Sequence, residues 1–465
     1  MLLSVPQHPK LVAAETKRAH WVLLWLCSLG LLAGTAGAQT DLQLTQQPAA
    51  SAAAPALITL QEALKRAQAS EPTFAAALAD ARVAGLDKSI ARAGLLPSVT
   101  YHNQALYTQP GGQGQGIGPN TFKFIGNNAV HEYASQAVVD ESIGLGQIAG
   151  VRRADAAAAV ASAELEIARR GLVAAVVGMY YGVSAANHKL TIAQQAADEA
   201  AAFVRLTSQR EQAREAAHAD TIKAQLELQS RDRELSDAKL NADKARLELG
   251  VLLFSDPRTP YSVTIPDAPA DLATREEVNQ RAAGNNAELK SALATLNLAS
   301  VDVLTARGAY LPGLSLNYTY GIDAPQFAVN GPDHVSNLGY SAMVTLDLPV
   351  WDWLATEHKI KQSEIKRSAA KTALTATQRR LIAQLDESYA EAQGARAQLA
   401  SLDASVATAA ESLRLTKLRY TGGEATVLEV VDAQTAYITA QNAREDGRVR
   451  YETAVAQLQN LTGTM

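Results

Sequence analysis

The chain repeats itself once, and no other feature constrains its fold as strongly. Landmarks of the first half return in the second half in the same order: the capping-box sequence Thr59–Glu62 returns at Thr274–Glu277, the Leu-Pro pair at 96–97 returns at 311–312, and Ala224-Gln225 returns at Ala433-Gln434. Because both order and spacing are kept, we interpret residues 57–253 and 272–463 as two copies of one unit.

Each copy predicts the same succession of elements. A helix of roughly 35 residues ends near Pro97 or Pro312, a β-hairpin follows at 97–140 or 312–349, and a helix of roughly 65–70 residues then leads through a reversal to a return helix of roughly 35–40 residues. In the second long helix apolar residues step by threes and fours, as in a coiled coil: Leu381, Leu385, Tyr389, Ala392, Leu399, Leu402, Val406, Ala409 and Leu413. At about 1.5 Å per residue, this helix is a rod of about 100 Å, longer than a compact domain contains.

The predicted strands have the composition of membrane strands. Ser98–Tyr107 and Gly313–Tyr320 hold no charged residue, and six of the 14 tyrosines fall in or beside the strands. Segments of about ten residues with aromatic side chains at their ends match transmembrane β-strands. On this interpretation the interface anchors are Trp351, Trp353, Tyr101 and Tyr318. A water-exposed β-hairpin remains the alternative from composition alone.

Four strands per chain cannot close a barrel, and an open sheet edge cannot lie in hydrocarbon, because its N–H and C=O groups would have no partner there. If the strands cross a membrane, several chains must share one barrel. Two chains supply eight strands and three supply twelve, and only the wider barrel leaves an open lumen. The number of strands alone is compatible with both a two-chain and a three-chain barrel.

The N-terminal region predicts export. Residues 1–38 read as a secretory signal peptide, with three basic residues before an apolar run and a small-residue cleavage site at Ala36–Ala38. The chain's only cysteine, Cys27, lies inside this segment, so the mature protein has no thiol. Residues 39–56 predict a disordered lead-in, and residues 254–271, which include four prolines, predict an extended connector between the copies.

Composition and motifs argue against several classes of function. A net charge of −5 excludes a basic footprint for nucleic acid. The glycine-rich stretch Gly111–Gly116 lacks the Lys-Ser/Thr of a phosphate-binding loop and predicts a loop between strands. His218 is interpreted as a solvated helix residue. We find no catalytic arrangement, no metal site and no cofactor motif, and therefore do not expect an enzyme.

The second reversal carries the most specific signal. Gly422 and Gly423 interrupt a helical pattern at the point where the chain must turn back. Beyond them, Glu429 and Asp432 are three residues apart and share one helix face just behind the turn. An isolated acidic pair is usually no more than part of a solvated helix face. A functional interpretation of this pair therefore depends on the motifs around it.

The plan and its motifs resemble the TolC-type outer membrane efflux family over nearly the whole mature chain. The matching residues are the Leu-Pro entries to the strands, the strand exit Leu348–Asp352, and Arg419-Tyr420 followed by Gly423 and the Leu428–Ala433 segment. The resemblance implies an α+β membrane protein. It would be a homotrimer with a twelve-stranded outer membrane β-barrel and a long α-helical periplasmic tunnel. It also implies two protein partners, a periplasmic adaptor and an inner membrane transporter, alongside outer membrane lipid.

The resemblance also implies roles for particular residues. In that family inward-bent helical hairpins close the periplasmic entrance, and the positions that match its acidic constriction are Glu429 and Asp432. Asp220 matches a position that in some members bonds the neighbouring hairpin near Tyr420. Ala425 stands where such members carry a basic residue, so an ionic latch is not expected.

Hairpin-tip residues are implied as adaptor contacts: Gly422, Gly423, Glu424, Arg214 and Glu215. The first tip has no glycine, which predicts a wider turn or a longer helix there. The favoured function is a passive exit duct of a tripartite efflux pump or a type I secretion system. The alternative is a periplasmic coiled-coil scaffold without a pore.

Overall fold

The computed structural model describes residues 56–464, apart from 108–130, 265–270, 325 and 332–335. The predicted signal peptide, the lead-in up to residue 55 and the glycine-rich loop at Gly111–Gly116 lie outside the described residues. Ala56, which we assigned to the lead-in, already belongs to the first strand.

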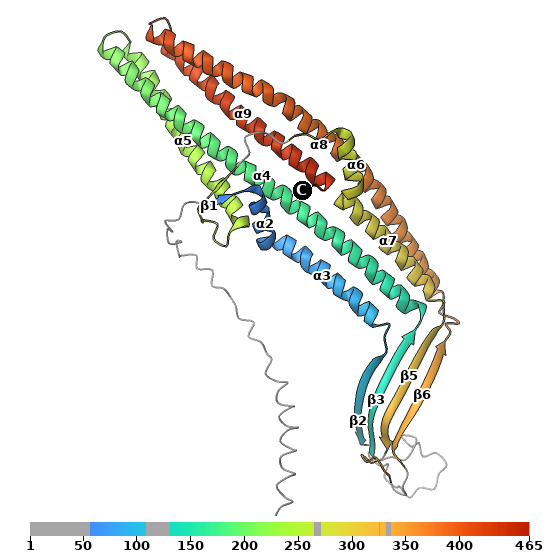
Figure 1. Cartoon of the computed structure of the whole chain (residues 1–465). Coiled ribbons are helices and arrows are strands. Elements are labelled where there is room, and N and C mark those ends of the chain that lie inside the picture. Colours follow the sequence, from blue (N-terminus) through green and yellow to red (C-terminus); the bar gives the residue numbers. More distant parts are fainter. Residues whose placement is uncertain (1–55, 108–130, 265–270, 325, 332–335, 465) are drawn as a thin grey trace, which may run out of the picture. The chain divides into compact units, whose positions relative to one another are not determined.

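The described elements follow one another in two similar series (Figure 1). The first is β1 (Ala56–Ile58), α2 (Leu60–Ser70), α3 (Pro72–Ala93), β2 (Ser98–Tyr107), β3 (His131–Ile143), α4 (Leu145–Gln212) and α5 (His218–Leu253). The second is β4 (Tyr261–Val263), α6 (Arg275–Asn285), α7 (Ala287–Gly308), β5 (Gly313–Ala324), β6 (Leu338–Asp347), α8 (Ala355–Thr421) and α9 (Val427–Thr462). We retain two copies of one unit as our proposal for the domain organisation.

The prediction of one continuous helix before each hairpin was wrong, because both helices break. In the first copy Pro72 has no N–H and disfavours helical geometry at Glu71, which instead caps α3 by accepting from the Phe74 N–H at 2.6 Å. In the second copy Asn286 caps α7 in the same way, accepting from the Leu289 N–H at 2.9 Å. Capping side chains therefore set both breaks.

Two long helices organise the helical part. The 68-residue α4 packs against α3 and α5, and the 67-residue α8 packs against α7 and α9 (Figure 1). Contacts of α4 with α7 and α9 join the two series. The predicted seam of α8 faces inward, since Leu381, Leu385, Ala392 and Leu413 are buried. Among the described residues, no helix is sufficiently long and apolar to span a membrane.

The four long strands form one antiparallel sheet in the order β2-β3-β5-β6. Its register aligns the apolar residues of all four strands: Val99 opposes Val139, Val139 opposes Tyr318, and Tyr320 opposes both Ala137 and Tyr340. Because side chains alternate along a strand, these residues share one face of the sheet, and Leu316, Val344 and Leu346 continue it. The sheet thus has an apolar face across its whole width.

The opposite face of the sheet is polar and internally hydrogen-bonded. Asn317 donates to the Asp140 carboxylate at 2.6 Å, and Gln136 donates to Asp323 at 3.2 Å. On the apolar face, the Ser135 hydroxyl lies 2.8 Å from the Tyr101 hydroxyl and donates to Asn103 at 2.8 Å. The charged residue Glu141 also falls on this face, opposite Leu316 and close to the end of β3 that leads into α4. The two faces therefore suit two different solvents.

A small parallel sheet ties the start of the first copy to the connector. β1 pairs with β4, so the predicted connector contains a strand. Tyr180 of α4 is 1% exposed and lies beneath this pair. Its hydroxyl lies 2.8 Å from the Ile58 carbonyl and 2.6 Å from the Thr264 carbonyl, and it accepts from the Thr264 N–H at 3.0 Å. Burial raises the pKa of this phenol.

We expect Tyr180→Phe to lower the free energy of unfolding by about 1 kcal/mol, because the backbone of Ile58 and Thr264 loses the hydroxyl that bonds it, without any loss of ring packing. Chemical denaturation of the purified protein measures the change. Tyr437→Phe is the control, since Tyr437 is only half-buried. Equal effects of the two variants would contradict the role assigned to the Tyr180 hydroxyl.

Candidate functional site

The two helical hairpins turn in the same way at neighbouring tips (Figure 1). In the first tip, the Arg214 N–H bonds the Glu211 carbonyl and the Glu215 N–H bonds the Arg210 carbonyl. In the second tip the corresponding bonds run from Gly423 to Tyr420 and from Glu424 to Arg419. Both are Schellman motifs, in which the residue past the helix end takes a left-handed conformation.

The expectation of a wider turn or a longer helix at the first tip was therefore wrong. Arg214 takes φ of 63° where the second tip has Gly423 at 82°. A non-glycine residue pays about 1–2 kcal/mol for this conformation, and the tip keeps the geometry nevertheless. Gly422 has an ordinary helical φ of −77°, so only one of the two glycines is required by the turn.

Glu429 has a structural partner that sequence analysis overlooked. Its carboxylate accepts from the Thr426 N–H at 3.2 Å, while the Thr426 hydroxyl accepts from the Glu429 N–H at 3.3 Å. This capping box starts α9. Arg419 lies 3.6 Å from the same carboxylate. Glu429 and Asp432 are both exposed, so the acidic face that we predicted is open to solvent.

Tyr420 is the centre of the contact between the hairpins. Its ring is 4% exposed, packs against Phe203 at 5.1 Å between centroids, and lies 4.9 Å beneath the Arg210 guanidinium. Arg210 also donates to the Tyr420 carbonyl oxygen and lies 3.6 Å from Glu215. Burial raises the pKa of the Tyr420 phenol, although the charge of Arg210 opposes this.

Asp220 is half-buried in the first turn of α5, and its charge adds to the raised pKa of Tyr420. The cation that packs over the Tyr420 ring is Arg210, a residue that sequence analysis did not single out. The two residues are far apart in the sequence, and no local motif signals their contact. Thr426, by contrast, was detectable, because Thr-x-x-Glu before a helix is a capping-box pattern.

The remaining predicted site residues lie at the two ends of the described region. At the tips Gly422, Gly423, Glu424, Arg214 and Glu215 are all exposed. At the sheet, Tyr101 is exposed and Tyr318 stacks on Tyr340 at 6.2 Å. Trp351 and Trp353 contact each other edge to face at 5.7 Å, and both are exposed. Trp353 and Leu354 take left-handed conformations in the link from β6 to α8.

Comparison with known proteins gives one consistent result. The family model described as "Outer membrane efflux protein" matches residues 63–253 and 278–464. Outer membrane protein OprJ of Pseudomonas aeruginosa is 24% identical over 163 residues, which are 35% of this chain and 34% of that protein. Outer membrane protein TolC of Vibrio cholerae is 24% identical over 192 residues, 41% of this chain and 44% of that protein. The matched segments thus span less than half of either relative.

The fold is shared over a greater length. The structure of the CmeC outer membrane channel of Campylobacter jejuni superposes with a TM-score of 0.75 at 16% identity, covering 87% of this chain and 85% of that chain. At this identity the likeness concerns the fold alone.

We expect Arg214→Gly to stabilise the first tip by about 1 kcal/mol, because glycine takes the left-handed conformation at no steric cost. Amide hydrogen exchange at the end of α4 reports the local change as slower exchange. Arg214→Ala is the matched control, since it removes the side chain but keeps the strain. Faster exchange in Arg214→Gly than in Arg214→Ala would contradict the assignment.

Proposed function

This chain belongs to the outer membrane efflux protein family and resides in the outer membrane, and from that premise we propose that three copies of it form the exit duct of a tripartite efflux pump or a type I secretion system. Family members are channels rather than enzymes, and the proposal assigns the chain no catalytic step. Its transport energy would come from an inner membrane transporter, reached through a periplasmic adaptor protein.

The single observation that carries the proposal is the two-faced sheet with open edges. Its apolar face runs across four strands, and its polar side chains bond one another on the opposite face. Among the described residues, β2 and β6 each have one neighbouring strand only. A lipid-facing sheet must satisfy its edge N–H and C=O groups, so β2 of one copy is proposed to pair with β6 of the next.

Three copies supply the twelve strands of a barrel with an open lumen, and the polar face of the sheet would line that lumen. The exposed rings of Trp351 and Trp353 would lie at a membrane interface, where amphipathic rings are favoured. Beyond the sheet, the long helices α4 and α8 would form the wall of a periplasmic tunnel.

The hairpin tips would form the periplasmic entrance. Three copies would bring Glu429 and Asp432 together as a ring of carboxylates, which attracts cations and repels anions. Within each copy, Arg210 would hold the second hairpin to the first through Tyr420. The exposed tip residues Gly422, Gly423, Glu424, Arg214 and Glu215 are proposed as adaptor contacts.

A matched pair of substitutions on β6 tests the barrel. Val344 lies on the apolar face and Thr345 on the polar face. We expect Val344→Arg to cost up to about 2–4 kcal/mol in lipid and to abolish assembled protein in outer membrane fractions. Thr345→Arg should assemble, because its side chain would point into a water-filled lumen.

The outcome also separates the duct from a pore-free periplasmic scaffold. A scaffold would tolerate both arginines equally, remain in the soluble fraction and conduct no current in planar bilayers. Any of these results would contradict the barrel.

The entrance is tested by Glu429→Gln combined with Asp432→Asn. Glutamine also completes a capping box, so the start of α9 is kept while the charge is removed. In planar-bilayer recordings we expect a smaller preference for cations and weaker block by multivalent cations. Glu387→Gln, an exposed change on α8, is the control. Unaltered selectivity in the double variant would remove these residues from the constriction.

A further inference from the structure

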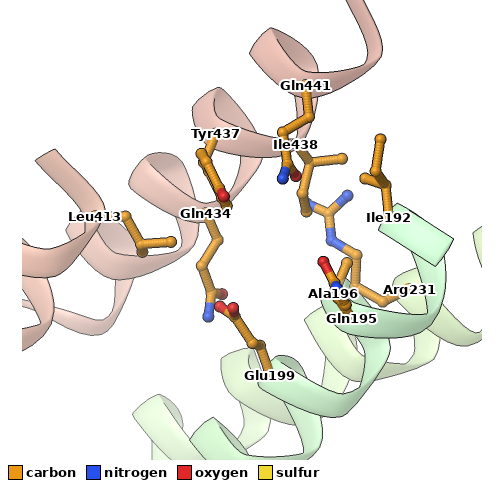
Figure 2. Close-up of a pocket in the computed structure, with 10 residues that line it drawn as sticks. All are labelled: Ile192, Gln195, Ala196, Glu199, Arg231, Leu413, Gln434, Tyr437, Ile438 and Gln441. Atoms are coloured by element: carbon orange, nitrogen blue, oxygen red, sulfur yellow. The ribbon is translucent and has the colours of Figure 1, made fainter. Parts of the chain in front are cut away.

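A small cavity lies between the two hairpins, behind their tips (Figure 2). Its volume is about 20 Å³, and residues of α4, α5, α8 and α9 line it. From the first hairpin come Glu199 and Arg231, and from the second come Leu413, Gln434 and Tyr437. The cavity therefore belongs to the contact between hairpins rather than to the interior of either one.

Gln434 gives this cavity its chemistry. The residue is 4% exposed, and no acceptor among the described residues lies within hydrogen-bonding geometry of its buried Nε2. Figure 2 shows its amide and the carboxylate of Glu199 pointing toward one another from opposite hairpins. A buried N–H group without a partner costs about 1–3 kcal/mol, so an acceptor at this position would be strongly favoured.

The two charged groups that line the cavity already have partners. Glu199 accepts from Lys417 of α8 at 2.6 Å. Arg231 is bonded to Glu227 at 2.6 Å and to Glu234 at 2.7 Å on its own helix, and it donates to Thr435 of α9 at 2.7 Å. Gln434 Nε2 is thus the one group lining the cavity whose buried atoms lack a partner among the described residues.

The missing partner must be small and must accept a hydrogen bond. One water molecule needs about 10–15 Å³ of such volume and two or more polar neighbours, and the cavity offers both. A cation would not satisfy an N–H donor. An anion would meet the negative charge of Glu199 close by, and the positive charge of Arg231 is already balanced by two glutamates.

We propose that this cavity is a binding site for one water molecule, which accepts from Gln434 Nε2 and donates to the Glu199 carboxylate. The water joins α9 of the second hairpin to α4 of the first. The contact between the hairpins is then hydrated at this point rather than dry, whereas nearer the other end of α9 it is made by direct bonds such as His188–Glu445 at 2.7 Å.

The direction in which one substitution changes the melting temperature tests the proposal. Methionine resembles glutamine in size but cannot donate. If Gln434 bonds a water, Gln434→Met in the full-length mature protein loses that bond, and the melting temperature falls by about 1–2 °C. If Gln434 is an unpartnered donor instead, the same change removes a buried penalty, and the melting temperature rises. An unchanged or higher value overturns the proposal.

Gln195→Met is the matched control, because Gln195 lines the same cavity from α4 but is exposed. We expect no comparable fall for it. An independent readout does not depend on any variant. Crystals of the unaltered protein at high resolution should show one solvent peak within about 3 Å of Gln434 Nε2. Its absence overturns the proposal, as does replacement of the peak by bromide in bromide-soaked crystals, which would identify an anion site.

Discussion

A strand edge cannot end in hydrocarbon, and on the proposed function this constraint governs the architecture of the chain. The four-stranded sheet satisfies its backbone internally between β2 and β6, and in the proposed barrel each outer edge would need a partner strand. The apolar face is built by register, since Val139, Tyr318 and Tyr340 fall on one side only because the strands pair as they do. A slip of one residue between β5 and β6 would carry Tyr340 to the polar face.

The two long helices are joined to the sheet by links of different length. Only Gly144 separates β3 from α4, so the first long helix begins almost where its strand ends. Between β6 and α8 the chain instead uses a longer link in which Trp353 and Leu354 both take left-handed conformations. Such conformations are costly for residues with a side chain, and they persist where surrounding structure requires them. The second copy therefore redirects its chain by strained backbone, whereas the first passes from strand to helix through the extended backbone of Gly144.

Much of this arrangement could be predicted from sequence, because periodicity and turn residues are local. The strand Ser98–Tyr107 and the long helices could be predicted because the residue pattern of each element is visible within its own stretch of sequence. The break at Glu71 was missed although Pro72 marks it, because the apolar pattern continues across it. Arg210 could not be identified at all, since its partner Tyr420 lies in the other hairpin and the pair has no shared motif. Pairing across hairpins is a property of tertiary packing, which a single sequence does not display.

The acidic pair behind the second tip illustrates how a residue with a proposed electrostatic role can also have a structural one. Glu429 completes a capping box, and a carboxylate at a helix N-terminus is also stabilised by the helix dipole. These interactions hold the side chain against the first turn of α9, where Arg419 lies 3.6 Å from its carboxylate. Asp432 lies one turn further along and is exposed. A capped Glu429 is fixed in position, and a fixed charge acts on ions at an entrance more strongly than one that is free to turn away. The cap that sequence analysis overlooked thus determines where the carboxylate of the proposed constriction lies.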